Sequence, residues 1–116
     1  MYNISETSKE TGLTKHTLRY YEKIELVAIK KDEKGHRIYK QADLSALTFI
    51  KCLTKTGMPL DQIKEMSKLA LVNPADNVDR ILSLLQSHKD KIVSDLKESK
   101  ESLKMINAKI DLALNL

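Results

Sequence analysis

Several residue types that mark particular protein classes are scarce in this sequence. It holds a single cysteine, Cys52, which cannot form an internal disulfide and persists best in a reducing compartment. Its three glycines form no phosphate-cradling loop, and no Ser-His-Asp spacing or other catalytic pattern is present. We therefore expect a protein that is not an enzyme.

Long hydrophobic runs are also missing. Residues 1–13 lack the basic start and apolar stretch of a secretory signal, and no apolar run is long enough to cross a membrane. These absences predict a cytoplasmic chain without a membrane partner. With 116 residues, of which 41% are hydrophobic and 31% charged, the chain has material for one folded core with one extended appendage.

Charge and aromatic residues divide the chain into two unlike parts. Residues 1–71 carry 13 Lys and Arg against 9 Asp and Glu, whereas residues 72–116 carry 7 against 7. All five aromatic residues lie before residue 50. A basic, aromatic-bearing part indicates a polyanionic partner, although surface lysines are more often simply solvated.

The first motif lies in residues 3–22. Asn3 and Glu6 have the spacing of a capping box, which predicts a short helix to about Glu10, and Gly12 supplies a turn. Thr14 is placed to cap a second helix. Helix, tight turn and helix is the arrangement of a helix-turn-helix, whose second helix enters the major groove of DNA. The candidate DNA-binding residues of this second helix are Lys15, His16, Thr17, Arg19, Tyr20 and Tyr21. Leu18 and one of the two tyrosines are expected to pack inward.

The second motif lies in residues 26–40. Two short β-prone runs flank a polar turn with Gly35 near its tip, which predicts a hairpin. A basic hairpin beside a helix-turn-helix forms a wing, which can place Lys or Arg against phosphates or in a minor groove. The candidate DNA-binding residues here are Lys34, His36, Arg37 and Tyr39.

The order of these motifs resembles the MerR family of bacterial transcriptional regulators. The resemblance rests on residues 18–22, then residues 35–39, then an acidic-apolar helix beginning near Asp43, and it continues through residues 49–52, 57–60 and 84–89. Two positions depart from the family pattern, because Glu25 stands where the family commonly has glycine and Ala28 where proline often follows the apolar pair. The resemblance implies binding to promoter DNA and action with RNA polymerase.

Residues 41–72 predict two further helices. In the first, residues 41–56, an apolar stripe is expected to face the core, and the second follows Pro59 up to the break at Asn73 and Pro74. Lys55, just before the connecting turn, is a further candidate for contact with phosphate. The expected stripe of the first helix consists of Ala46, Phe49, Ile50 and Leu53.

A heptad pattern fills residues 78–114, which contain no glycine or proline. Nine of its eleven seam positions are apolar, and Lys89 and Ser99 are the exceptions. A single helix cannot bury such a seam, so it predicts a second chain; in the family that this sequence resembles, the partner helix is antiparallel. The expected dimer interface consists of Val78, Leu82, Leu85, Ile92, Leu96, Leu103, Ile106 and Ile110.

The signal that such a regulator senses is less evident. The three histidines are far apart and no cysteines follow the long helix, so we expect no metal site and no cofactor. Cys52 is the remaining candidate, because residues 49–52 resemble the branch of the family proposed to sense electrophiles through a single cysteine. Lys51 and Lys55 are placed to favour its thiolate. The competing interpretation is a buried, inert thiol.

Together these patterns predict a mainly α-helical protein with a winged helix-turn-helix DNA-binding domain (residues 1–72), a linker (73–77) and a long antiparallel coiled-coil dimerisation helix (78–116). The expected function is that of a MerR-like transcriptional regulator that binds double-stranded promoter DNA as a homodimer on a palindrome. Its effector stays unknown. The alternative is a coiled-coil adaptor for another protein, which would have no use for a basic wing.

Overall fold

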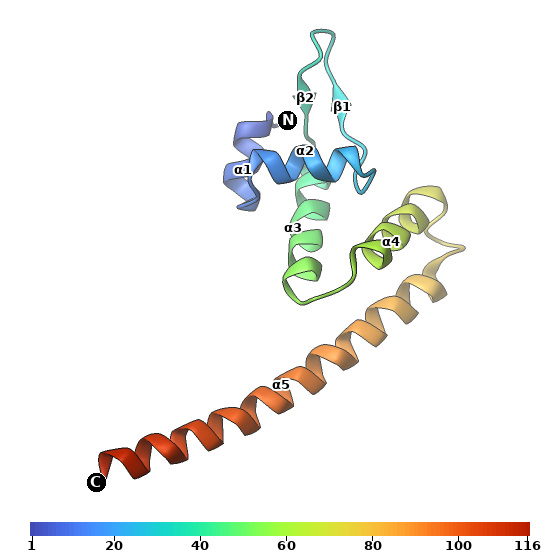
Figure 1. Cartoon of the computed structure of the whole chain (residues 1–116). Coiled ribbons are helices and arrows are strands. Elements are labelled where there is room, and N and C mark those ends of the chain that lie inside the picture. The colour runs from blue at the N-terminus through green and yellow to red at the C-terminus, as the bar shows by residue number, and fades with distance from the viewer. The chain divides into compact units, whose positions relative to one another are not determined.

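The computed structural model describes all 116 residues, in two compact units formed by Met1–Ile81 and Leu82–Leu116 (Figure 1). Five helices and one two-stranded antiparallel sheet make up the chain. In chain order the elements are α1 (Ile4–Thr11), α2 (Lys15–Lys23), β1 (Lys30–Lys31), β2 (Arg37–Ile38), α3 (Gln41–Lys55), α4 (Leu60–Val72) and α5 (Val78–Leu114). The mainly helical fold predicted from the sequence is confirmed.

Side-chain caps fix the helix-turn-helix formed by α1 and α2. Asn3 Oδ1 accepts from the Glu6 amide at 2.8 Å while the Glu6 carboxylate accepts from the Asn3 amide at 3.0 Å, so the predicted capping box is present. Gly12 ends α1 with a left-handed backbone, φ 74°. Thr14 then caps α2, because its hydroxyl accepts from the Thr17 amide at 3.0 Å. Three local signals thus set the angle between the two helices.

The wing is shorter than its sequence pattern predicts. Strand β1 pairs with β2 through Lys30 with Ile38 and Lys31 with Arg37, and residues 26–29 are not a strand. Leu26 packs in the core instead, with 1% of its surface exposed. A second backbone connection was not predicted: the amides of Tyr2 and Tyr39 each donate to the other residue's carbonyl at 2.8 Å. The start of the chain therefore extends the base of the wing.

The core of residues 1–81 is built from one face of each helix and from the base of the wing. Its most completely buried large side chains are Leu18, Leu26, Tyr39, Leu47 and Ile63. The predicted apolar stripe of α3 is partly wrong, because Ala46 and Phe49 are exposed whereas Ile50 and Leu53 are buried. The buried face of α3 is Leu44, Leu47, Ile50 and Leu53. The apolar residues of α3 form more than one stripe at helical spacing. Packing against the rest of the core determines which of these stripes is buried.

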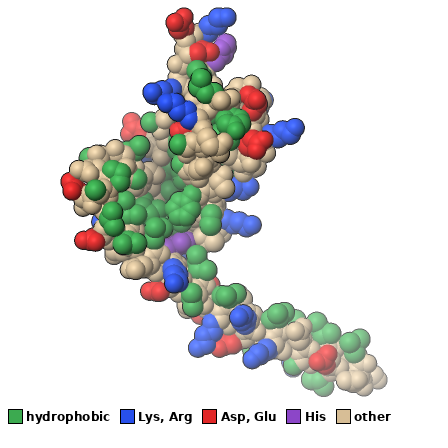
Figure 2. Space-filling view, turned by 180° about the vertical axis from the view of Figure 1, so that it is seen from behind, with side chains coloured by type: hydrophobic (Ala, Val, Ile, Leu, Met, Phe, Trp, Pro, Cys, Tyr) green, Lys and Arg blue, Asp and Glu red, His purple; other side chains and the backbone are tan.

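Helix α5 is 37 residues long, roughly 55 Å at 1.5 Å per residue. Hydrophobic side chains are exposed along it (Figure 2). Among its exposed apolar seam residues the exposed fraction runs from 37% for Ile92 to 56% for Leu103 and Ile106, whereas Leu85 is half-buried. No helix of the chain combines the length and the apolar character that crossing a membrane requires.

Glu25 is the one non-glycine residue with a positive φ, 62°. It follows the end of α2, where the Leu26 amide donates to the Tyr21 carbonyl at 2.9 Å and the Glu25 amide donates to the Glu22 carbonyl at 3.0 Å. This pair of bonds is the Schellman motif, whose left-handed position is usually a glycine. The glycine that the MerR pattern commonly has here is thus explained by backbone geometry, and Glu25 adopts the same turn at a steric cost.

Replacing Glu25 by glycine is expected to stabilise the protein. The substitution relieves roughly 1–2 kcal/mol of left-handed strain and costs about 0.5–1 kcal/mol of unfolded-state entropy. We expect a net gain of about 0.5–1 kcal/mol in the free energy of unfolding, measured by urea titration followed by circular dichroism. Glu33→Gly, which removes the same charge from the wing turn at a residue without positive φ, should lower the free energy of unfolding by about 0.5–1 kcal/mol, because it carries the same entropy cost and relieves no strain. Equal effects of the two substitutions would contradict the assignment of strain to Glu25.

Candidate nucleic-acid interface

Helix α2 presents a basic, solvent-exposed face. Lys15, His16 and Arg19 are exposed, and Tyr20 keeps 45% of its surface open to solvent. Leu18 and Tyr21 lie on the opposite side, buried at 1% and 7%. The helix therefore separates cleanly into a face that packs and a face that offers cationic and hydroxyl donors. Such donors are the groups that contact base edges and phosphates.

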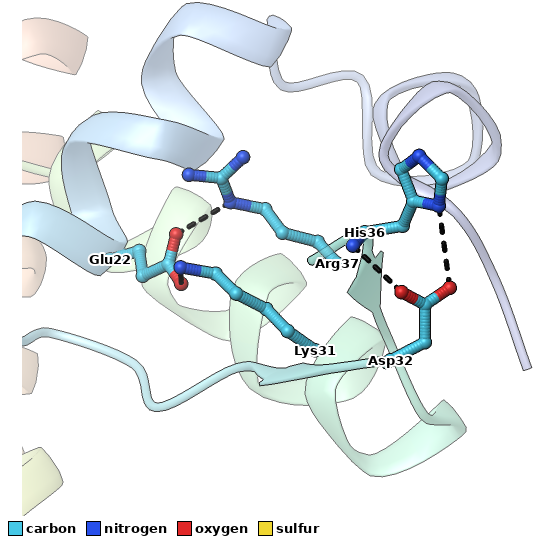
Figure 3. Close-up of polar contacts among 5 residues, drawn as sticks. All are labelled: Glu22, Lys31, Asp32, His36 and Arg37. Atoms are coloured by element: carbon cyan, nitrogen blue, oxygen red, sulfur yellow. Dashed lines mark hydrogen bonds and ion pairs between the residues drawn. The ribbon is translucent and has the colours of Figure 1, made fainter. Parts of the chain in front are cut away.

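Glu22 ties this helix to the wing. Its carboxylate accepts from Arg37 Nε at 2.6 Å and lies 3.6 Å from Lys31 Nζ, so that one acidic residue of α2 holds a cation from each strand (Figure 3). Glu22 is 17% exposed and Arg37 27%, so solvent screens this pair less than it screens a surface ion pair. The two terminal nitrogens of the Arg37 guanidinium make no hydrogen bond within the chain. Arg37 is thus held in place and still has donors to offer.

A shallow open groove joins the two motifs. Arg19 from α2 and Gly35, His36 and Arg37 from the wing line it, together with residues 1–5 at the start of the chain, and its volume is about 670 Å³. Arg19 and Arg37, which are 18 positions apart in sequence, therefore contribute to one surface. The structure brings together predicted residues from both motifs at this groove.

The tip of the wing is held by Asp32. Its Oδ1 accepts from the Lys34 amide at 2.9 Å and from the His36 amide at 2.8 Å, and its Oδ2 lies 3.4 Å from His36 Nδ1 (Figure 3). The bond from the His36 amide is the main reason that the pKa of the Asp32 carboxyl lies below its usual value, with the Lys34 amide and the His36 ring adding to it. These contacts leave Lys34 and His36 exposed at the tip.

Two of the predicted DNA-binding residues are core residues. Tyr21 is 7% exposed and Tyr39 is completely buried, so neither ring is available to DNA and their place among the DNA-binding candidates is wrong. The burial of Leu18 and Tyr21, with Tyr20 exposed, confirms the expectation that one of the two tyrosines packs inward. The hydroxyl of Tyr39 is buried without a hydrogen-bond partner, and burial raises its pKa. Strand alternation predicted that Tyr39 shares a face with Arg37, but β2 ends at Ile38, and the Tyr39 ring is buried whereas the Arg37 side chain is 27% exposed. Thr17 is half-buried, and its hydroxyl accepts from that of Thr14 at 2.9 Å, so it serves the cap.

Two predicted residues lie on α3. Cys52 is exposed, and sensing at its thiol stays a prediction. Lys51, which was expected to favour the thiolate, has another partner: its Nζ donates to the Thr11 carbonyl at the end of α1, at 3.1 Å. Lys55 lies one helical turn beyond Lys51 on the same face and is exposed. A contact between Lys55 and phosphate also stays a prediction.

Three residues that position the interface were missed from the sequence. Glu22 and Asp32 were counted as ordinary charges, and Tyr2 was not assigned at all. The signal for Glu22 was its place at the end of a basic helix directly before a basic hairpin, where a lone carboxylate needs cationic partners. Asp32 lies two residues before Lys34 and four before His36, a spacing that favours a side-chain-capped turn.

Comparison with known proteins agrees with this geometry. Residues 2–69 match the model of the MerR HTH family regulatory proteins. The chain is 30% identical to the HTH-type transcriptional regulator YyaN of Bacillus subtilis, over 96% of this chain and 89% of that protein.

Solved structures are similar in fold as well. HiNmlR, a MerR family regulator lacking the sensor domain and bound to promoter DNA, is 29% identical, with a TM-score of 0.81 over 89% of this chain and 78% of HiNmlR. A putative MerR family transcriptional regulator from Listeria monocytogenes is 25% identical, with a TM-score of 0.89 over 96% of this chain and 84% of that one. The motifs, the groove and the matched family model lead to one conclusion: the chain belongs to the MerR family of DNA-binding transcriptional regulators.

Proposed function

We propose that this regulator binds a palindromic promoter operator as a homodimer, with α2 of each subunit in a major groove and the wing against the neighbouring backbone. The observation that carries this proposal is the shared groove, where Arg19 and the anchored Arg37 lie on one surface. Phosphate contacts supply affinity and helix N-terminal residues read base edges. The exposed members of the proposed interface are Lys15, His16, Arg19 and Tyr20 on α2, Lys34 and His36 in the wing and Lys55 at the end of α3, and the half-buried Arg37 joins them.

The dimer is supported by the exposed seam of α5. Val78, Leu82, Leu96 and Ile110 are each between 46% and 54% exposed. A contiguous apolar face of this length is unfavourable in water and marks an association surface. A symmetric dimer presents two α2 helices, which explains a preference for a palindrome. Action with RNA polymerase belongs to the same proposal and is supported by family membership.

Loss of exposed cations on α2 is expected to weaken DNA binding in a way that depends on their position. Arg19→Ala should lower the affinity for the operator by about tenfold, and Lys15→Ala should lower the slope of log affinity against log salt by about one per phosphate contact removed. Fluorescence anisotropy with the upstream promoter DNA at two salt concentrations measures both effects.

Lys68→Ala is the matched control, because Lys68 is an exposed lysine on α4 and its loss changes the net charge equally. Affinity and salt slope should stay at the wild-type values in this variant. If Lys15→Ala and Lys68→Ala behave alike, binding depends on net charge alone and the interface proposed on α2 is excluded. If no variant binds DNA with a steep salt dependence, the coiled-coil adaptor is favoured.

Dimerisation is expected to depend on the seam of α5. Leu96→Glu places a charge in the middle of the seam at a side chain that is 54% exposed in the single chain, so the fold of the subunit should survive. We expect a monomer by size-exclusion chromatography with light scattering, and weaker binding to the palindrome. Lys97→Glu, one residue away and outside the seam, should remain a dimer. A dimeric Leu96→Glu variant would show that the seam is not the interface.

A further inference from the structure

The turn between α1 and α2, residues 12–14, is shaped by side chains of α1. The Ser8 hydroxyl donates to the Leu13 carbonyl at 2.6 Å, and the Leu13 amide donates to the Thr11 hydroxyl oxygen at 3.3 Å. The Thr11 hydroxyl in turn donates to the Thr7 carbonyl at 2.7 Å, and both threonines are buried. All of these bonds lie within α1 and its turn, so they make no polar link between the turn and the rest of the core.

Lys51 of α3 supplies that link. Its Nζ donates to the Thr11 carbonyl at 3.1 Å, across 40 positions of sequence. Thr11 is the last residue of α1, where carbonyls have no partner within the helix and the helix dipole places partial negative charge. Lys51 is half-buried and forms no ion pair with a carboxylate, so the end of α1 is the negative group that its ammonium contacts.

Gly12 leaves the room that this contact needs. A Cβ atom at Gly12 would lie 2.6 Å from Lys51 Nζ, so a side chain there would displace the ammonium. The glycine thus serves two purposes, because it adopts the left-handed backbone of the turn and lets the lysine approach. The turn and the long cation from α3 form one arrangement.

The two ends of α2 are anchored by different elements. Lys15 and His16 at its N-terminal end follow Gly12 by three and four positions, and N-terminal residues are the ones that a recognition helix offers to base edges. At the other end, Glu22 holds the cations of the wing. Lys51 therefore acts on the end of α2 that reads bases in the proposed function.

We propose that Lys51 is a positioning residue that fixes the N-terminal end of α2, and that the preference for the operator over other DNA depends on it. Without the ammonium, the Thr11 carbonyl loses its partner and the turn shifts to reach water. Phosphate contacts tolerate such a shift because every sequence offers the same phosphates, whereas base contacts require one orientation of the helix. The proposal rests on the proposed function, in which α2 enters the major groove.

Lys51→Met tests the proposal, because it keeps a long unbranched side chain and removes the ammonium. In anisotropy titrations the affinity for promoter DNA should fall about tenfold, the size of one lost base contact, while the affinity for a scrambled duplex of equal length and composition should not change. The slope of log affinity against log salt should stay at the wild-type value, since no phosphate contact is lost. Lys51→Arg, which keeps the charge and the N–H donors, should recover most of the affinity for promoter DNA.

Lys68→Met is the matched control, because it makes the same substitution at an exposed lysine of α4. Both affinities and the salt slope should stay at the wild-type values in this variant. Circular dichroism establishes that each variant is folded. Lys51→Gln, which also removes the charge, takes the place of Lys51→Met if the latter does not fold.

Loss of the preference for promoter DNA in Lys51→Met, with recovery in Lys51→Arg, supports the proposal. A loss of affinity for both duplexes with a shallower salt slope shows that Lys51 contacts phosphate itself, and overturns it. An equal loss in Lys51→Arg, or a preference in Lys51→Met equal to that of Lys68→Met, overturns it as well. Failure of the proposed function looks different, because the wild-type protein itself would then show no preference between the duplexes, and both proposals would fall.

Discussion

The candidate DNA-binding surface, formed by α2 and the wing, depends on one carboxylate. Glu22 ends the exposed helix α2 and holds Arg37 at 2.6 Å and Lys31 at 3.6 Å, one cation from each strand of the wing. Two short strands of two residues each are too small to hold an orientation of their own. Because Glu22 is mostly shielded from water, its attraction for these cations is screened less than that of a surface pair. Helix and wing therefore act as one unit.

A second set of contacts holds the base and the tip of the wing. The bridge between Tyr2 and Tyr39 joins the start of the chain to the base of the wing, and the buried ring of Tyr39 anchors that base in the core. Asp32 orders the tip by accepting two backbone amides. Lys31 and Arg37 are thus held by a neighbour on a wing that is itself ordered, which limits the entropy that they would lose in the proposed contacts with phosphates. In the proposed dimer, pairing through α5 joins two copies of this surface.

Local signals made much of this fold predictable. Asn3, Gly12 and Thr14 act through neighbours within four residues, so their roles could be inferred from spacing alone, and the long helix α5 could be inferred from its heptad pattern and its lack of glycine and proline. Tyr39 and Phe49 could not be placed, because their burial depends on which distant segments pack against them. Glu22 was missed for the same reason, since its partners lie 9 and 15 positions further along the chain. At Glu25 the sequence showed only that the glycine common in the family is missing, and the positive φ in the structure gives the reason for that preference.

The affinity of a Glu22→Gln variant for operator DNA tests the central claim most directly, because the two possible roles of Glu22 predict opposite signs. If Glu22 positions the wing, removing its charge frees Arg37 and Lys31 and should weaken binding by about five- to tenfold, roughly 1–1.4 kcal/mol. If Glu22 contributes only a negative charge near DNA, its neutralisation should strengthen binding. Glu33→Gln, at the exposed wing turn, gives the size of the plain charge effect. Tighter binding by Glu22→Gln, equal to that of Glu33→Gln, would contradict the account.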